Sequence, residues 1–264
     1  MRTRDRVVVM RRYALALLVV WLAAPAAAEL VAGGAARVVE VIDGDTVVLD
    51  TGEQLRMVGI QAPKLPLGRP EFATWPLAGE AKGALEALAL DRMVTLSFGG
   101  RRIDRHGRLL AHLHRADGLW LQGEMLRLGL ARVYSFRDNR TLVPEMLALE
   151  AAARGARRGI WAHRFYAVRR AEPGAVPYDG FELVVGRVLD VAERRARTYL
   201  NFGADWKTDF TVSIATRHRR LFEREGWDLA ALKDRLVRVR GWVKRFNGPL
   251  IEVTHPEQIE VIEE

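Results

Sequence analysis

Residues 36–60 read ARVVEVIDGDTVVLDTGEQLRMVGI, and this stretch decides the fold. Apolar and β-branched residues alternate with polar ones, and the alternation is broken at Asp43-Gly44-Asp45 and at Thr51-Gly52. A period of two is typical of strands with one buried face, and glycine beside aspartate is typical of tight turns. The stretch therefore predicts a meander of three strands.

The residues that follow predict helices and two further strands. Four prolines between positions 63 and 76 predict a long loop. Apolar periodicity then predicts helices over 77–90, 119–128 and 142–158, and alternation predicts strands over 94–98 and 109–113. This part of the chain is therefore expected to be mainly β with helices, an α+β fold.

A boundary is expected near residues 171–179, which read AEPGAVPYD and have no periodicity. We expect a first domain over 36–165, a linker over 166–181 and a second domain over 182–264. The second domain has the pattern strand–strand–strand–helix–strand–strand. This order fits a small five-stranded barrel of the oligonucleotide/oligosaccharide-binding (OB) type.

Residues 1–28 have the composition of a signal peptide. Five arginines and an apolar run precede Ala26-Ala27-Ala28, which supplies the small residues of a cleavage site before Glu29. The run is shorter than the ~20 residues that span a bilayer, although an uncleaved membrane anchor is the alternative. We expect cleavage, export to the periplasm or the medium, no stable membrane insertion afterwards, and a flexible lead-in over 29–35.

Cysteine content and charge narrow the function classes. The chain has 41 Lys and Arg, 33 Asp and Glu, and no Cys. The absence of cysteine excludes thiol catalysis, thiolate–zinc sites, iron–sulfur clusters and disulfides. Residues 29–170 have 21 basic and 16 acidic residues, whereas residues 171–264 have 15 basic and 16 acidic ones. A polyanionic partner is therefore expected for the first domain.

Three segments of the first domain resemble the active-site segments of the staphylococcal nuclease-like (thermonuclease) family. They are VIDGDTV at Val41–Val47, LRMVGIQAP at Leu55–Pro63 and DRHGR at Asp104–Arg108. Their order and spacing agree across residues 36–165. The resemblance implies a five-stranded OB-type barrel with three helices that cleaves DNA and RNA phosphodiesters with Ca²⁺, so nucleic acid is the expected partner.

The resemblance assigns roles to individual residues. It places the two phosphate-binding arginines at Arg56 and Arg108, and a Ca²⁺ ligand at Asp45 with Asp43 beside it. Two guanidinium groups suit this reaction because negative charge builds up on the phosphate oxygens in the transition state. A hard cation such as Ca²⁺ takes oxygen ligands. Arg105, inside the DRHGR segment, is a further candidate for contact with substrate.

Three positions depart from the family pattern. Where the resemblance implies a second metal-binding aspartate, a threonine and a general-base glutamate, this chain has Gln61, Ala62 and Lys64. Gln61 keeps a carbonyl oxygen, but the lost negative charge predicts weak Ca²⁺ binding. Lys64 is expected to bind phosphate, and loss of a general base lowers the rate about 10²- to 10⁴-fold. Glu71, in the next loop, is a candidate replacement base.

The sequence leaves three functions open. The first is an exported phosphodiesterase, a DNA/RNA endonuclease of thermonuclease type with a degenerate metal and general-base site. The second is a catalytically weak or inactive nucleic-acid-binding protein that keeps the phosphate clamp, by which we mean Arg56 and Arg108. The third is an interaction module that does not bind nucleic acid. In the second domain, Tyr199, Phe202, Trp206 and Trp242 fit single-strand binding. Its net charge of −1 fits a structural role equally well.

Overall fold

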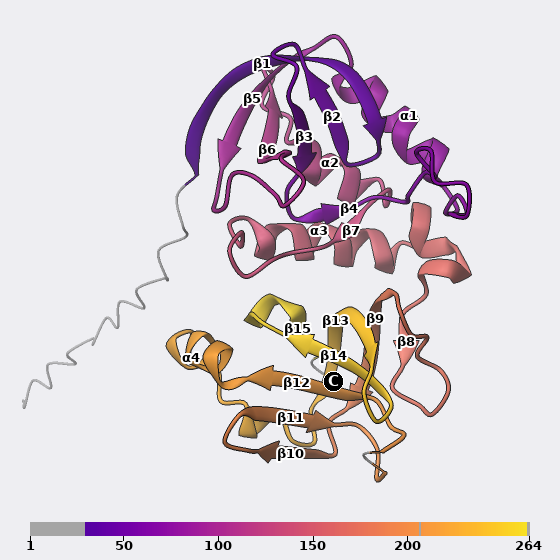
Figure 1. The fold of residues 1–264 in the computed structure, drawn as a ribbon, viewed down its shortest axis with the longest axis vertical. Helices are drawn as coiled ribbons and strands as arrows, with labels where there is room; N and C mark the ends of the chain where they lie inside the picture. The colour runs from indigo at the N-terminus through magenta and orange to yellow at the C-terminus, as the bar shows by residue number, and fades with distance from the viewer. Residues whose placement is uncertain (1–29, 206, 263–264) are drawn as a thin grey trace, which may run out of the picture.

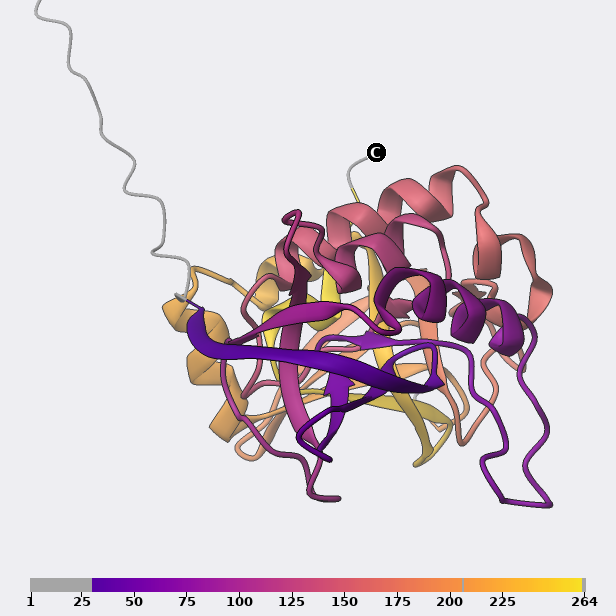
Figure 2. The ribbon, with the colours of Figure 1, turned by 90° about the horizontal axis from the view of Figure 1, so that it is seen from above.

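The computed structural model describes residues 30–205 and 207–262. The expected signal peptide and Trp206 lie outside these residues. The described chain forms two units, one above the other in Figure 1, with the helix α3 at the level where they meet. In Figure 2 the long strand β1 crosses the first unit, and the helices α1 and α3 lie on one side of it.

The first unit is a closed barrel with the strand order β1–β2–β3–β6–β5, in which β3 and β6 run parallel. Its strands are β1 (Val31–Asp43), β2 (Thr46–Leu49), β3 (Gln54–Met57), β5 (Met93–Phe98) and β6 (Leu109–Arg115). Along β1 the side chains of Ala36, Val38 and Val41 point into the core, and a register shift lies between Val38 and Glu40. The expected α+β class with an OB-like barrel is confirmed.

Helices cover the barrel where apolar periodicity predicts them. They are α1 (Ala78–Ala89), α2 (Leu121–Arg127) and α3 (Val143–Gly155), followed by the 3₁₀ turns η1 (Gly159–Ala162) and η2 (Arg164–Tyr166). Helix α1 buries Ala81, Leu85 and Ala89 in the barrel core. A separate two-stranded sheet pairs β4 (Ile60–Gln61) with β7 (Arg132–Val133). Among the described residues, no helix is both long and apolar enough to traverse a membrane.

The start of β1 differs from the expected lead-in. Val31 and Ala32 pair with Phe98 and Ser97 of β5, and the pairing resumes at Ala35 after an irregularity. Residues 31–35 are exposed, so they carry no apolar alternation that could have predicted a strand. Backbone hydrogen bonds to β5 extend the strand here without a buried face.

The second unit repeats the strand order of the first. Its strands are β9 (Phe181–Arg187), β10 (Asp190–Glu193), β11 (Arg197–Asn201), β12 (Thr211–Ala215), β13 (Leu236–Arg245), β14 (Pro249–Val253), β8 (Arg169–Arg170) and β15 (Ile259–Val261). The pairing order is β10–β11–β12–β14–β13–β9–β8, with β15 on β13 and with β12 parallel to β14. Only Val188 and Leu189 separate β9 from β10, so one bent stretch supplies β10, at one end of the curled sheet, and β9, next to β8 at the other end.

The helix α4 (Thr216–Arg224) of the second unit follows its third strand, β12. In the first unit, α1 likewise stands between the third and fourth barrel strands, β3 and β5. The short turns η3 (Ala230–Leu232) and η4 (Pro256–Gln258) complete the described chain. A second core of residues such as Val212, Phe222 and Ile251 fills this unit. The two units are therefore OB-like, each with its own core.

The stretch expected as a linker, 166–181, is packed rather than extended. Within it β8 pairs in parallel with β9, and Val176 belongs to the core of the second unit. Tyr166 is buried and donates a hydrogen bond to the carbonyl oxygen of Pro76 in the first unit, at 2.7 Å. This stretch therefore has fixed contacts with both units.

A buried ion pair holds the two units together. Arg240 on β13 and Glu150 on α3 are both buried, and the Arg240 Nη2 to Glu150 Oε1 distance is 2.8 Å. Glu260 also accepts a hydrogen bond from Arg240. Burial alone would lower the pKa of Arg240, but these two carboxylates outweigh it and raise the pKa. Breaking a buried pair leaves an uncompensated charge, so the pair fixes how the units meet.

His255 is a second buried polar contact between the units. Its Nε2 lies 2.8 Å from Ser135 Oγ of the first unit. Burial, followed by the positive charges of Arg140 and Arg240, lowers the pKa of His255 to about 3. Arg140, itself from the first unit, is paired with Glu225 and Glu257 of the second, both at 2.6 Å.

We predict that the protein loses stability as the pH falls below about 6.5. The unfolded His255 binds a proton near pH 6.5, whereas the folded one does so only near pH 3. Between these values unfolding takes up a proton, so the free energy of unfolding falls by up to about 1.4 kcal/mol per pH unit. Urea unfolding of the wild type and of His255→Gln at pH 7.5, 6 and 5 measures this slope.

His255→Gln should flatten the pH dependence, while the matched change His106→Gln at an exposed histidine should leave it unchanged. A wild-type slope that survives His255→Gln in full would contradict the assignment. Burial and then the charge of His114 lower the pKa of His112 to about 4. His112 therefore leaves a smaller slope of stability against pH in His255→Gln.

Candidate functional site

The turn between β1 and β2 places two aspartates at one end of the barrel. Asp43 and Asp45 are both buried, and the Asp45 amide donates to Asp43 Oδ1 at 3.0 Å. A Cβ atom at Gly44 would lie 2.7 Å from the Cβ atoms of Ala62 and Ala81. The glycine is therefore required for the close approach of this turn to the segment after β4 and to α1.

The Asp45 carboxylate is fully engaged by protein groups. It accepts hydrogen bonds from the Ala62 amide at 2.8 Å, Thr46 Oγ1 at 3.1 Å, Arg56 Nη1 at 3.2 Å and Lys64 Nζ at 2.6 Å. Burial would raise the pKa of Asp45, but the charges of Arg56 and then Lys64 lower it well below the usual range. Asp45 is therefore ionised and saturated by these four donors.

Lys64 places its ammonium group between the two aspartates. Its Nζ lies 2.6 Å from Asp45 Oδ2 and 3.1 Å from Asp43 Oδ2, and its side chain is 15% exposed. Burial and then the charge of Asp45 raise the pKa of Asp43, and Lys64 opposes this shift. Lys64 was expected to contact substrate phosphate. It lines the cavity, but its direct partners in the structure are carboxylates.

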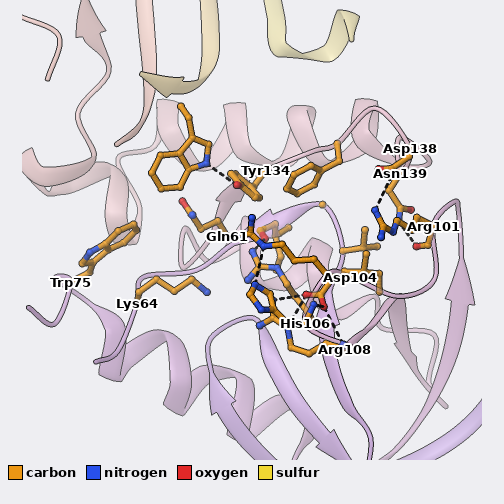
Figure 3. A pocket seen from close by; sticks show the side chains of 18 of the residues that line it. Gln61, Lys64, Trp75, Arg101, Asp104, His106, Arg108, Tyr134, Asp138 and Asn139 are labelled. Carbon is orange, nitrogen blue, oxygen red and sulfur yellow. Dashed lines mark hydrogen bonds and ion pairs between the residues drawn. The ribbon is translucent and has the colours of Figure 1, made fainter. Parts of the chain in front are cut away.

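Arg56 and Arg108 are brought to the same cavity by the parallel pairing of β3 and β6. Arg56 is opposite Leu110, two residues after Arg108, and both arginines line a cavity of about 720 Å³ (Figure 3). Arg56 Nη2 also donates to the Ile60 carbonyl at 3.3 Å. The two guanidinium groups that the sequence singled out therefore share one cavity.

A turn ending in glycine orients Arg108. Gly107 has a φ of +80°, and Asp104 Oδ1 accepts from the amides of His106 and Arg108 at 2.8 and 3.1 Å. Asp104 Oδ2 then accepts from both Arg108 Nε and Arg108 Nη2, at 2.9 and 2.7 Å, and these two bonds to one oxygen orient the guanidinium group. Arg105 lines the cavity as well, is exposed, and contacts His106 Nε2 through its Nε at 3.0 Å.

Gln61 is turned to a buried arginine. Its Oε1 accepts from Arg132 Nε and Nη2 at 2.9 and 2.8 Å, and both side chains are buried. The Arg132 guanidinium lies 4.8 Å from the ring centre of Phe181 and 5.8 Å from that of Trp75. Burial lowers the pKa of Arg132 to about 10, although Glu182 opposes the shift. The carbonyl oxygen considered for Ca²⁺ is thus committed to a cation of the protein.

The residues present do not fit a Ca²⁺ ion. Of the groups that the resemblance implies, Gln61 is bound to Arg132, and Lys64 brings a positive charge to Asp43 and Asp45. The part of the chain that the structure describes contains no cluster of three or more His, Cys, Asp or Glu side chains able to hold a metal. A cation site needs uncompensated oxygen ligands, which Asp43, Asp45 and Gln61 do not offer.

The position of Glu71 does not suit the role of replacement base that was considered for it. Its side chain is exposed and is not among the residues that line the cavity, whereas Arg69, Phe72 and Trp75 of the same loop do line it. The Arg69 guanidinium lies 4.0 Å from the ring centre of Phe72. The loop therefore contributes cationic and aromatic groups rather than a base.

Aromatic side chains from both units form another part of the cavity wall. Tyr134 and Phe136 come from the first unit and Trp242 from β13 of the second. Trp242 Nε1 donates to the Tyr134 hydroxyl at 2.7 Å, and the Arg56 guanidinium lies 5.9 Å from the Tyr134 ring centre. In Figure 3, Tyr134 and Gln61 appear above the Asp104, His106 and Arg108 group, and all of them line the cavity. Sequence reasoning did not connect Trp242 with this site.

Comparisons with known proteins find relatives of this chain. Residues 54–163 match the family described as staphylococcal nuclease homologue. The chain is 31% identical over 129 residues to an "Uncharacterized endonuclease" of Escherichia coli. The aligned part covers 48% of this chain and 76% of the relative. The chain is 30% identical to a "Thermonuclease" of Staphylococcus hyicus, with 48% and 75% covered. It is 34% identical to "Protein ParB" of Escherichia coli, with 58% and 84% covered.

We predict that Lys64→Glu creates a Ca²⁺ site. The change removes the ammonium group from Asp43 and Asp45 and adds a third carboxylate beside them, and Ca²⁺ affinity rises with ligand charge. Isothermal titration calorimetry should show Ca²⁺ affinity at least about tenfold higher than in the wild type. Lys64→Met removes the cation without adding a ligand and should show a smaller gain.

Lys82→Glu, on the outer face of α1, is the control for a general change in charge and should not alter Ca²⁺ binding. Wild-type protein that binds Ca²⁺ as tightly as Lys64→Glu would contradict the placement of the Lys64 ammonium group.

Proposed function

Because the chain belongs to the family of staphylococcal nuclease homologues, we propose that it binds nucleic-acid phosphodiesters between Arg56 and Arg108 and that its hydrolytic machinery has been replaced. The observation that carries this proposal is the position of Lys64 Nζ, 2.6 Å from Asp45 and 3.1 Å from Asp43. An ammonium group already compensates the two carboxylates. Binding of phosphate then requires no metal ion.

The retained groups are those that recognise a phosphodiester. Arg56 and Arg108 are planar donors facing one cavity, and Asp104 holds Arg108 by two hydrogen bonds to its Oδ2. Arg69 and Arg105 add positive charge to the cavity wall. Guanidinium groups pair with phosphate oxygens through two parallel hydrogen bonds, which gives both affinity and orientation.

The missing group is a base that could activate water. Lys64 stands where the family places its glutamate, and an ammonium group paired with two carboxylates cannot accept a proton. Loss of a general base alone lowers the rate about 10²- to 10⁴-fold. The phosphate clamp therefore supports binding more strongly than it supports cleavage.

Slow hydrolysis is the second candidate function, and the retained pair of arginines favours it. Arg56 and Arg108 are placed to stabilise the charge that develops on a phosphorane-like transition state, and such electrostatic groups retain part of the rate when the base is lost. The expected activity is a phosphodiesterase of thermonuclease type.

We predict salt-dependent binding of single-stranded DNA and RNA that Arg108→Met weakens. Losing one phosphate contact should reduce the slope of log K against log salt concentration by about 0.7, measured by fluorescence anisotropy. Arg170→Met removes an equally charged but exposed side chain outside the cavity and should change little. Binding that is absent, or that salt leaves unchanged, would overturn the proposal.

The same samples separate binding from hydrolysis. Micromolar protein is incubated with the labelled strands with and without Ca²⁺ or Mn²⁺, and Arg56→Met serves as the background. Binding without cleavage above this background agrees with the proposal. Cleavage that Arg56→Met abolishes establishes the second candidate in its place.

We also infer export to the periplasm or the medium, which the basic head, apolar run and Ala26-Ala27-Ala28 of residues 1–28 support. After expression of the full chain in a bacterium, N-terminal sequencing should find a mature protein that begins at Glu29. An intact N-terminus in the membrane fraction would instead indicate an uncleaved anchor.

A further inference from the structure

We propose that a single-stranded nucleic acid held at the arginine pair continues along the outer face of β13 onto the second unit. This inference rests on the function proposed above and names the form of nucleic acid that the site takes. We call the three side chains that carry it, Trp242, Lys244 and Phe246, the β13 track.

The β13 track follows from the alternation of side chains along this strand. Trp242 and Lys244 are exposed, while Val243 between them is buried in the second core. Phe246, at the turn that joins β13 to β14, is 61% exposed, and Trp242 is 46% exposed. Residues two apart on a strand share a face, about 7 Å from one another. Two aromatic rings and a cation therefore line one side of the strand and its turn.

The track joins two hollows of the surface. Trp242 lines the cavity that contains Arg56 and Arg108, whereas Lys244 and Phe246 line a second hollow of about 270 Å³. Trp242 and Lys244 are consecutive outward residues of β13, so the strand leads from the lining of the first hollow to that of the second. A ligand that leaves the arginine pair past Trp242 reaches the second hollow without leaving the strand.

Trp242 is held in a fixed position at the junction. Its Nε1 donates to the Tyr134 hydroxyl at 2.7 Å, and the Tyr134 ring packs edge-on against Phe136 and Phe181, with ring centres 4.9 and 4.8 Å away. The buried pair of Arg240 and Glu150 anchors the same strand two residues earlier. The ring is thus preorganised as a platform, which lowers the entropy cost of stacking a base on it.

The second hollow has the chemistry of a nucleic-acid backbone site. Arg197, Lys244 and Arg245 line it, and Glu252 is its acidic residue. Glu252 accepts from Lys244 at 3.1 Å and from Arg197 at 3.3 Å, which orients both cations and leaves a positive excess. Phe246 and Tyr199 add two further rings.

This combination points to a single strand rather than a duplex. Exposed aromatic rings stack on bases only when the bases are unpaired, and cations beside them follow the backbone. OB-type folds bind oligonucleotides on the face of their second and third strands and on the loop between the fourth and fifth. Here that loop is the β13–β14 turn that carries Phe246, and Tyr199 and Ser213 come from the second and third strands, β11 and β12.

The test compares a dinucleotide, which reaches only the arginine pair, with a twelve-nucleotide single strand. Labelled dT2 and dT12 are titrated with the full-length protein and with its Phe246→Ala, Trp242→Ala and Trp242→Phe variants. Phe246→Ala should weaken dT12 about 5- to 150-fold, the equivalent of about 1–3 kcal/mol of stacking on one base, and leave dT2 unchanged. Trp242→Phe keeps a stacking ring and should retain most of the affinity that Trp242→Ala loses.

Leu189→Ala, at an equally exposed apolar side chain between β9 and β10, is the control and should bind both ligands as the wild type does. Urea unfolding verifies that each variant is folded. If dT2 binds but Phe246→Ala leaves dT12 affinity unchanged, the β13 track is overturned while the proposed function stands. If neither strand binds, the proposed function itself fails.

Two further ligands test the form of the partner. A twelve-base-pair duplex should bind more weakly than dT12, and equal binding would overturn the preference for a single strand. Polyglutamate should compete poorly, because it has charge without rings. Competition by polyglutamate that equals that of dT12 would identify an acidic peptide surface instead and overturn the proposal.

Discussion

A carboxylate without solvent exposure, Asp45, governs the arrangement of the cavity. A buried charge is unfavourable unless hydrogen bonds and opposite charges compensate it. In this chain the compensation comes from Arg56 on β3, from the Ala62 amide after β4, and from Lys64 in the loop. All three groups come from residues 56–64, and Asp45 ties this stretch to the turn between β1 and β2. The position of Arg56 at the cavity wall is a consequence of this requirement.

The same requirement fixes the second unit. Glu150 is fully buried on α3 and accepts hydrogen bonds from the Val133 amide, from Arg154 and from Arg240. Arg240 belongs to the other unit, so the placement of β13 against the first barrel adds the buried cation that completes the compensation of Glu150. Trp242, two residues further along β13, then reaches the Tyr134 hydroxyl. The second barrel thus contributes to the cavity because an ion pair holds it there.

Periodicity predicted the strands and helices of the first unit, because these follow from local patterns. The resemblance to the nuclease family implied the closed barrel and the roles of Arg56 and Arg108, which the parallel pairing of β3 and β6 brings to one cavity. The sequence shows a cationic residue at position 64, but it did not indicate that its partners are Asp43 and Asp45. That outcome depends on how the loop after β4 folds back over the turn. Arg132 and Arg240 were overlooked, although an arginine that alternates with apolar residues in a strand is a signal for a buried ion pair or cation–π contact. The position of Trp242 depends on how two domains meet, which no local pattern encodes.

A lysine in place of a metal ion has an electrostatic consequence for the proposed binding of phosphodiesters. Two buried aspartates without a cation would repel an approaching phosphate. A divalent ion removes that repulsion only while it is bound. Lys64 and Arg56 supply two positive charges covalently, against the two negative charges of Asp43 and Asp45. Arg69, Arg105 and Arg108 then face the ligand, with Asp104 as their acidic neighbour. The cavity therefore stays attractive to an anion whatever the concentration of Ca²⁺.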